Sequence, residues 1–197
     1  MKRSFLQRII PFAFILVILI LIIAAITAVV RVVFNNNAPT TSVVDTSSVA
    51  LLSTTAEHKV RMTVRGPIVG NEQFRSYQVT VTPDSRDFVR YSGYLDQPLV
   101  SKHYGNNVKA YDEFVHALSK ANLNKGAALT GDADDTRGIC ATGQVLEFEI
   151  ISGDTVTKRL WTSTCKASPG SLATDSTQLR VLFLAQVPDA NNYIGKN

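Results

Sequence analysis

Acidic residues are absent from one part of this chain. The first 34 residues contain no Asp or Glu, whereas the whole sequence of 197 residues has 16 acidic and 20 basic side chains. Four of the basic residues lie in that segment, so residues 35–197 carry equal numbers of the two signs. The formal charge of +4 therefore belongs to the amino terminus. This distribution argues against a nucleic-acid-binding domain in the remainder.

The N-terminal segment also has a long run without polar residues. Residues 9–30 are almost entirely Ile, Leu, Val, Ala and Phe. As a helix this run would span about 33 Å, which is enough to cross a hydrocarbon core. The run is longer than the apolar part of a signal peptide and has only a poor cleavage site, so a retained anchor is favoured over a cleaved signal peptide. We expect a transmembrane signal-anchor helix over residues 9–34, in contact with the lipid bilayer.

The flanking charges predict the orientation of this helix. Lys2, Arg3 and Arg8 precede it, and Arg31 alone lies near its other end. By the positive-inside rule, residues 1–8 are expected to be a cytoplasmic basic tail. The rest of the chain would then lie outside a cell membrane that it crosses once.

A polar segment separates the anchor from the rest of the chain. Residues 35–55 are rich in Ser, Thr and Asn, and such a composition predicts a flexible linker. Within it, residues 49–52 (Val-Ala-Leu-Leu) could instead form one short helix, with Ser47 and Ser48 as candidate caps. An extracytoplasmic domain is expected over residues 56–197.

The first half of the expected domain has the pattern of β-strands. Apolar and polar residues alternate over residues 59–65 and 77–82, as in strands with one buried face. Residues 88–95 and 99–104 are two more candidate strands, and Gly, Pro and Asp residues supply turns between the four. These segments predict an antiparallel meander.

The second half mixes helices with a hairpin. Apolar residues have helical spacing over residues 107–118 and again over residues 174–186. Between them, residues 146–150 and 156–162 alternate around a Ser-Gly-Asp turn, which predicts a β-hairpin. The order of elements indicates an α+β fold, with an antiparallel sheet of about five to six strands and two helices packed on one face.

Charges are unevenly distributed along the domain. Residues 59–90 carry six basic and three acidic side chains, and residues 132–154 carry six acidic and one basic. Cross-strand pairing of opposite charges would explain this pattern, with each exposed pair contributing roughly a few tenths of a kcal/mol. A charged binding patch is the alternative. The sequence favours pairing.

Cysteine is scarce, and Cys140 and Cys165 are its two instances. They flank the expected hairpin, so both would lie at its open end. Outside the cytoplasm such a pair can form a disulfide. Closing the loop between them would stabilise the fold by about 3.5 kcal/mol on the chain-entropy model. We therefore expect a structural disulfide.

Residues 162–165 (Thr-Ser-Thr-Cys), behind an N-terminal anchor, resemble part of the signature of the sortases. Members of this family are transpeptidases with a nucleophilic cysteine at the end of a strand. The resemblance implies Cys165 as the nucleophile, His103 as the acid/base and Arg180 as the group that stabilises the oxyanion. Two positions of the motif differ, and a disulfide to Cys140 would consume the nucleophile. A sortase-like cysteine transpeptidase is therefore the alternative and not the leading hypothesis.

Metal and cofactor motifs were sought and not found in the sequence. His58, His103 and His116 are widely spaced, and none has a second His or Cys at ligand spacing. The sequence also has no phosphate-binding loop and no dinucleotide fingerprint. We expect neither a metal nor a cofactor.

Aromatic residues make up only 8% of the chain, and several gather in the middle strands. Packing in the core is the expected role for Phe88, Tyr91, Tyr94 and Tyr104. An exposed aromatic face that binds a peptide or a glycan is the alternative.

Short motifs carry one further resemblance. They occur at residues 65–68, 91–94, 111–118, 138–140, 161–165 and 186–188. In these motifs the chain resembles uncharacterised single-pass envelope proteins of ultrasmall, reduced-genome bacteria. The resemblance implies an anchored domain with two cysteines and no known activity. We expect a non-enzymatic, membrane-tethered module that has a structural role in the envelope or binds an envelope protein, a peptide or a glycan.

Overall fold

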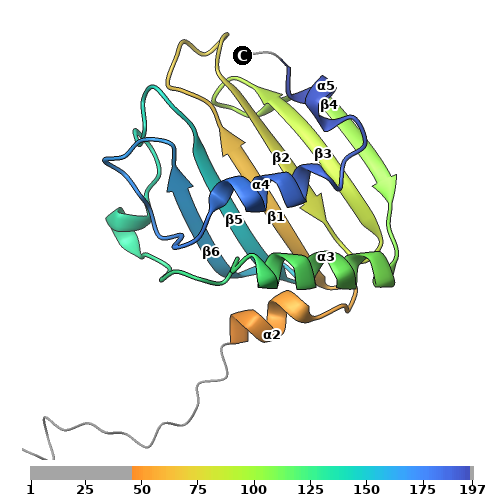
Figure 1. Cartoon of the computed structure of the whole chain (residues 1–197). Coiled ribbons are helices and arrows are strands. Elements are labelled where there is room, and N and C mark those ends of the chain that lie inside the picture. Colours follow the sequence, from red (N-terminus) through yellow and green to blue (C-terminus); the bar gives the residue numbers. More distant parts are fainter. Residues whose placement is uncertain (1–45, 196–197) are drawn as a thin grey trace, which may run out of the picture. The chain divides into compact units, whose positions relative to one another are not determined.

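A computed structural model gives the fold of residues 46–195. These residues form one antiparallel sheet with the strand order β4-β3-β2-β1-β5-β6 (Figure 1). The strands are β1 (His58–Arg65), β2 (Arg75–Val81), β3 (Ser85–Ser92), β4 (Gln97–Gly105), β5 (Val145–Ser152) and β6 (Thr155–Ser163). The α+β class and the antiparallel sheet expected from the sequence are confirmed.

The path of the chain places the late hairpin beside the first strand. Strands β1 to β4 form a meander, as expected, and β5 then returns to pair with β1 on its free side. Met62 lies between Val79 of β2 and Phe148 of β5. Strands β4 and β6 are therefore the two edges of the sheet.

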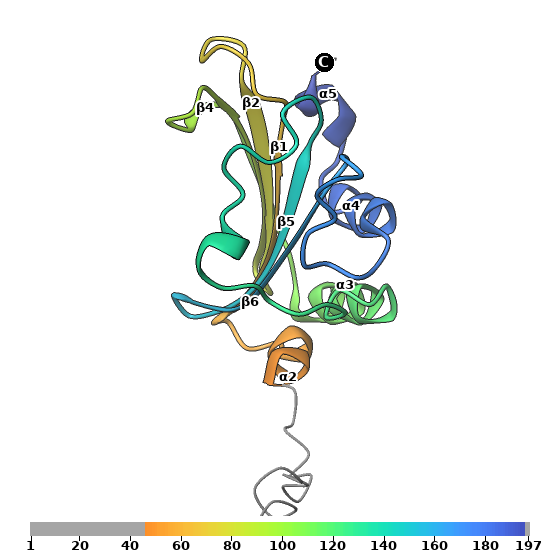
Figure 2. The same ribbon diagram turned by 90° about the vertical axis from the view of Figure 1, so that its left-hand side faces the viewer.

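The helices cover one face of this sheet. They are α2 (Thr46–Leu52), α3 (Val108–Lys120), α4 (Ser176–Leu184) and α5 (Ala190–Ile194), and a short 3₁₀ helix, η1, covers Gly131–Asp134. Figure 2 shows α3, α4 and α5 on one side of the sheet and η1 on the other. The two longer helices match those expected from the sequence. Asn107 caps α3 by accepting a hydrogen bond from the Ala110 N–H.

Strand alternation explains why the core lies under the helices. Alternate residues of β1, β2 and β5 point toward α3 and α4, and the Phe114 and Phe183 rings of those helices meet edge to face at 5.3 Å. Full burial of each large apolar side chain contributes roughly 1.5–3 kcal/mol. The buried residues of the three strands that belong to this core are Val60, Met62, Val64, Tyr77, Val79, Val81, Leu146, Phe148 and Ile150.

The folded domain begins earlier than the sequence indicated. The short helix expected at residues 49–52 is present as α2, but it begins at Thr46 and packs against α3 and β5. Its Leu51 side chain is fully buried. The expected linker boundary at residue 55 is therefore wrong, because α2 supplies apolar surface to the core.

The opposite face carries a smaller cluster under a long loop. The loop between α3 and β5 crosses the β5–β6 end of the sheet, where Cys140, Val145 and Trp161 are buried together. Cys140 is bonded to Cys165, with an S–S distance of 2.07 Å and a Cα–Cα distance of 5.3 Å. The predicted disulfide is thus confirmed, and it ties the loop to the end of β6.

The predicted basic tail and transmembrane helix lie outside the described residues. Residues 35–45 of the predicted linker also lie outside the described residues. Between residues 46 and 195, no helix is both long enough and apolar enough to cross a membrane.

Candidate functional site

The three residues of the sortase-like alternative do not converge. Cys165 follows edge strand β6 and is bonded to Cys140, whereas His103 lies on the opposite edge strand, β4. Five inter-strand spacings of about 4.8 Å separate the two edge strands by about 24 Å. The His103 imidazole instead contacts the Asp87 carboxylate at 2.5 Å. Arg180 lies on α4, which covers the other face of the sheet.

The four aromatic residues considered as a binding face are divided between several environments. Phe88 is fully buried under the helices, and Tyr104, on the same side of the sheet, lies near Tyr193. Tyr91 has the opposite strand parity to Phe88 and faces away from the core. Tyr94 lies in the β3–β4 turn and stacks on Phe74 at 4.1 Å.

Tyr91 and Tyr94 line separate hollows. Tyr91 borders a polar one of about 240 Å³ beside Arg61 and Glu149, and Tyr94 borders another. Together with Phe74, Ile68 and Ile139 it borders an apolar cavity of about 330 Å³. The other two histidines are elsewhere: His58 begins β1 and its imidazole contacts the Thr55 hydroxyl, while His116 is half exposed on α3 and contacts Asp112 of its own helix.

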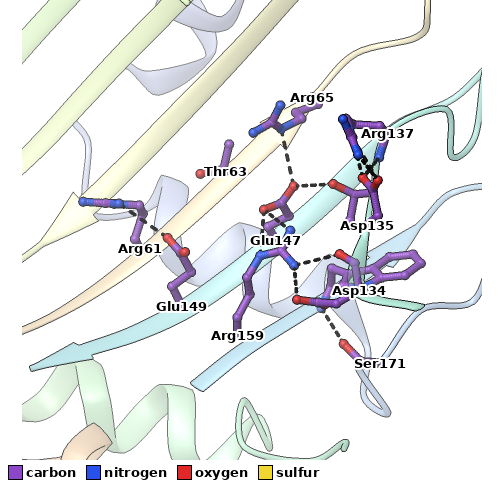
Figure 3. A network of polar contacts seen from close by, with 12 residues as sticks. Arg61, Thr63, Arg65, Asp134, Asp135, Arg137, Glu147, Glu149, Arg159 and Ser171 are labelled. Atoms are coloured by element: carbon purple, nitrogen blue, oxygen red, sulfur yellow. Dashed lines mark hydrogen bonds and ion pairs between the residues drawn. The ribbon is translucent and has the colours of Figure 1, made fainter. Parts of the chain in front are cut away.

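Ion pairs join β1, β5, β6 and the long loop on the face opposite the helices (Figure 3). Glu147 is the centre of this group: it contacts Arg159 at 2.8 Å and Arg65 at 3.4 Å, and it accepts a hydrogen bond from the Thr136 hydroxyl at 3.1 Å. We call the set the open-face network, and its charged members are Arg61, Arg65, Asp134, Asp135, Arg137, Glu147, Glu149 and Arg159.

Charges within the open-face network balance. Its four arginines each contact at least one of its four carboxylates. Burial alone would lower the pKa of Arg159, but its bonds to Glu147 and Asp134 outweigh burial and raise it. Hydrogen bonds from Arg137 lower the pKa of Asp135 to about 2. These ion pairs therefore have a structural role and hold the long loop on the sheet. The predicted cross-strand pairing of charges is confirmed for Arg61 with Glu149 and for Arg65 with Glu147.

A second group of arginines lies at the helix-covered side of the sheet and has no carboxylate partner among residues 46–195. Two of them border a cavity of about 410 Å³ between the ends of β1, β2 and β3, Ile194 of α5 and residues 142–144. Arg75 and Arg90 line this cavity, and none of the described residues that line it carries a carboxylate. We call it the arginine cavity.

Arg90 and Tyr77 face each other across the β2–β3 pair. The Arg90 Nε is buried and has no hydrogen-bond partner among residues 46–195. Its terminal nitrogens lie against Gly195, where a Cβ atom would approach within 2.7 Å and where φ is +79°. A glycine at this position thus lets the backbone pack directly on the guanidinium group.

Tyr77 is only 5% exposed, and its hydroxyl makes no hydrogen bond of normal geometry within the described part of the chain. Burial raises the pKa of this hydroxyl, and the positive charge of Arg180 opposes the rise. The Arg180 guanidinium carbon lies 5.8 Å from the centre of the Tyr77 ring. At neutral pH the Tyr77 hydroxyl therefore keeps its proton and remains available as a donor.

The other cations near the cavity bind neutral oxygens. One terminal nitrogen of Arg75 donates to the carbonyl oxygens of Glu72 and Phe74 and to the Ser92 hydroxyl. Arg180 donates to the Gln144 side-chain oxygen at 3.1 Å. These contacts orient the guanidinium groups and leave their charge uncompensated.

The disulfide positions the loop that carries Gln144. A Cβ atom on Gly143 would lie 2.6 Å from the Cys140 sulfur and 2.2 Å from the Thr164 hydroxyl, so the loop backbone packs directly on the bridge. Gln144 and Thr164 then exchange two hydrogen bonds, at 2.8 and 2.9 Å. The bridge therefore supports Gln144, which in turn supports Arg180.

Neither a protein-family model nor a curated protein matches this chain. Residues 46–195 contain no group of three or more His, Cys, Asp or Glu side chains that could hold a metal ion. The arginine cavity was not identified from the sequence. The basic excess over residues 59–90 was the available signal. Four of the arginines in this range are paired with carboxylates or bonded to neutral oxygens, and only the fold separates them from Arg90.

Proposed function

We propose that this protein is a non-enzymatic binding module, held outside the membrane by an N-terminal anchor over residues 9–34. The observation that carries the proposal is the arginine cavity: Arg75 and Arg90 line it, its described lining has no carboxylate, and the Tyr77 hydroxyl opposite Arg90 has no hydrogen-bond partner of normal geometry within residues 46–195. A stable domain gains nothing from such an arrangement, and a ligand would compensate it.

Other observations support the tether and the compartment. The apolar run and its flanking charges favour an anchored chain whose C-terminal part is outside. The Cys140–Cys165 disulfide fits an oxidising compartment. The resemblance to anchored envelope proteins of reduced-genome bacteria agrees with both.

One comparison of two variants tests this proposal against the cysteine transpeptidase. For a binding module, Cys140→Ala and Cys165→Ala break the same bond, so both variants should lose ligand binding and stability to the same extent in intact cells. For a transpeptidase, Cys165→Ala alone abolishes transfer of a labelled peptide or amine to the cell surface, whereas Cys140→Ala retains it. Loss of a transfer activity in the Cys165 variant alone would overturn the proposal.

A second measurement addresses the topology. Of two reporters fused after Asn197, the one that is active outside the cytoplasm should give a signal and the one that is active only in the cytoplasm should not. Protease added to intact cells should degrade the domain. A reporter active only in the cytoplasm contradicts the proposed orientation.

A further inference from the structure

We propose that the arginine cavity binds a monocarboxylate, that is, a ligand with one carboxylate group attached to a small apolar body. This inference rests on the proposed binding function and names its ligand class. Three features of the cavity lead to it: unneutralised positive charge, unused hydrogen-bond donors and apolar walls.

Charge is the first feature. The cavity is lined by Arg75 and Arg90, Arg180 contacts its Tyr77 and Gln144, and its described lining contains no Asp or Glu. On the other face of the same sheet every arginine of the open-face network has a carboxylate partner. A partly buried cation is costly without a counterion, and residues 46–195 supply none here, so an anion that enters the cavity gains an interaction that these residues leave unmade.

The donors are the second feature. Arg90 and Tyr77 are directly opposite in the β2–β3 register and both line the cavity, and neither the Arg90 Nε nor the Tyr77 hydroxyl has a hydrogen-bond partner of normal geometry within residues 46–195. Neighbouring groups cover both atoms in the free protein, so a ligand reaches them by displacing those groups. A guanidinium group presents two parallel N–H groups to the two oxygens of a carboxylate, and a tyrosine hydroxyl can donate a third bond. These donors fit a planar anion.

The walls are the third feature. Val64, Pro67, Val69 and Ile194 line the cavity beside the charged groups. A volume of about 410 Å³ lies within the range of small-molecule sites, so it can hold a short branched or linear hydrocarbon group in addition to the carboxylate. One nitrogen of Arg75 is already occupied by three acceptors, which favours a single negative charge over the two of a phosphate.

The test is a titration of the full chain in nanodiscs of zwitterionic lipid with three probes: 3-methylbutanoate, its neutral isostere 3-methylbutanamide, and inorganic phosphate. Calorimetry gives the affinity, and NMR of labelled tyrosine reports contact with Tyr77. We expect the carboxylate to bind at least tenfold more tightly than the amide and the phosphate, with a shift of the Tyr77 signal.

Two variants with the same change in net charge locate the site. Arg90→Met should weaken binding of 3-methylbutanoate at least tenfold. Arg61→Met, which removes a paired arginine from the opposite face, should change it less than twofold. Tyr77→Phe should weaken it by about threefold to tenfold, because one donor to the carboxylate is lost.

The remaining outcomes overturn the inference in distinguishable ways. Equal affinity for the amide would show that the cavity binds without using its charge, which leaves the binding module in place and removes the ligand class. Phosphate binding as tight as carboxylate binding would replace the monocarboxylate by a smaller dianion. No saturable binding of any probe would reject an anion site here, while the proposed function would still be judged by the two cysteine variants.

Discussion

The two faces of the sheet use arginine in opposite ways. On the open face, four arginines meet four carboxylates, and these contacts hold the long loop against β5 and β6. At the helix-covered end, Arg75, Arg90 and Arg180 have no carboxylate partner among residues 46–195, and two of them line a cavity. On the open face, the protein supplies a carboxylate for every arginine of the network. At the arginine cavity, the described residues supply none.

The difference separates a structural role from a binding role. Removing one partner of a buried ion pair destabilises the fold, because the remaining charge is left buried without compensation. An unpaired, partly buried charge stabilises nothing in the free protein and interacts favourably with a ligand that supplies the missing partner. Binding residues often have arrangements that lower the stability of the free protein. The arginine cavity fits that description, and the open-face network does not.

Removal of the disulfide should have the largest effect, because the bridge supports both regions. The change of Cys140 and Cys165 together to serine opens a loop of 25 residues, and the free energy of unfolding should fall by about 3.5 kcal/mol. Urea unfolding can be followed by the fluorescence of Trp161, the single tryptophan, which is buried beside Cys140. The reduced wild-type protein should match the variant. A loss under about 1 kcal/mol would mean that the bridge does not support the loop.

A matched pair of substitutions tests the comparison directly. Arg159→Met leaves Glu147, which is 6% exposed, without its shortest ion pair, and should lower the free energy of unfolding by about 2 kcal/mol. This is below the roughly 3–5 kcal/mol of fully buried pairs because the Arg159 side chain is 24% exposed. Arg90→Met removes a cation without a carboxylate partner, so stability should change by less than about 0.5 kcal/mol. Equal losses in the two variants would show that the regions do not differ.

A second pair separates an unbonded hydroxyl in the cavity from one in the core. Tyr111 lies on the buried face of α3, and its hydroxyl, like that of Tyr77, has no hydrogen-bond partner of normal geometry in the described chain. Tyr77→Phe and Tyr111→Phe should each leave stability unchanged or raise it by about 1 kcal/mol, since each removes a buried polar group that forms no bond. Only Tyr77→Phe should weaken binding of 3-methylbutanoate. Weaker binding in both variants would point to a general effect on the core.

The smallest effect concerns acid pH on the open face. Hydrogen bonds from Arg137 lower the pKa of Asp135 to about 2, so the stabilisation from this contact is fully present above the unfolded value of about 3.9 and is lost as the pH falls toward 2. The NMR carboxyl signal of Asp135 should titrate near pH 2. In Arg137→Gln the midpoint should move up toward the unfolded value. An unchanged midpoint would show that Arg137 is not the cause.

Much of the fold was predictable from local patterns. Alternation of apolar residues identified the strands, and helical spacing identified α3 and α4, because both patterns depend on neighbouring residues. The disulfide followed from two cysteines on either side of one hairpin. The sequence offered a short helix at residues 49–52 but placed it in the linker, because its surroundings are polar and the burial of Leu51 depends on helix α3, which lies far along the chain.

The candidate site was much less predictable. The basic excess over residues 59–90 was interpreted as cross-strand pairing, and this is correct for Arg61 and Arg65. It does not hold for Arg75 and Arg90, because their strand positions face the other side of the sheet, where the described residues provide no carboxylate partner. The histidine, cysteine and arginine suggested by the sortase resemblance occur in the expected order along the sequence, yet the fold puts His103 and Cys165 at opposite edges of the sheet.

The sequence by itself determined the local elements, the pair of cysteines and the excess of positive charge at the amino terminus, because each depends on residue type and short-range spacing. The tertiary structure decided which arginines have partners. Arg61 meets Glu149 across 88 residues of chain because β5 pairs with β1, and a change of register by one residue would turn that arginine toward the helices. The balanced network and the arginine cavity are thus products of strand order and register, which composition does not specify.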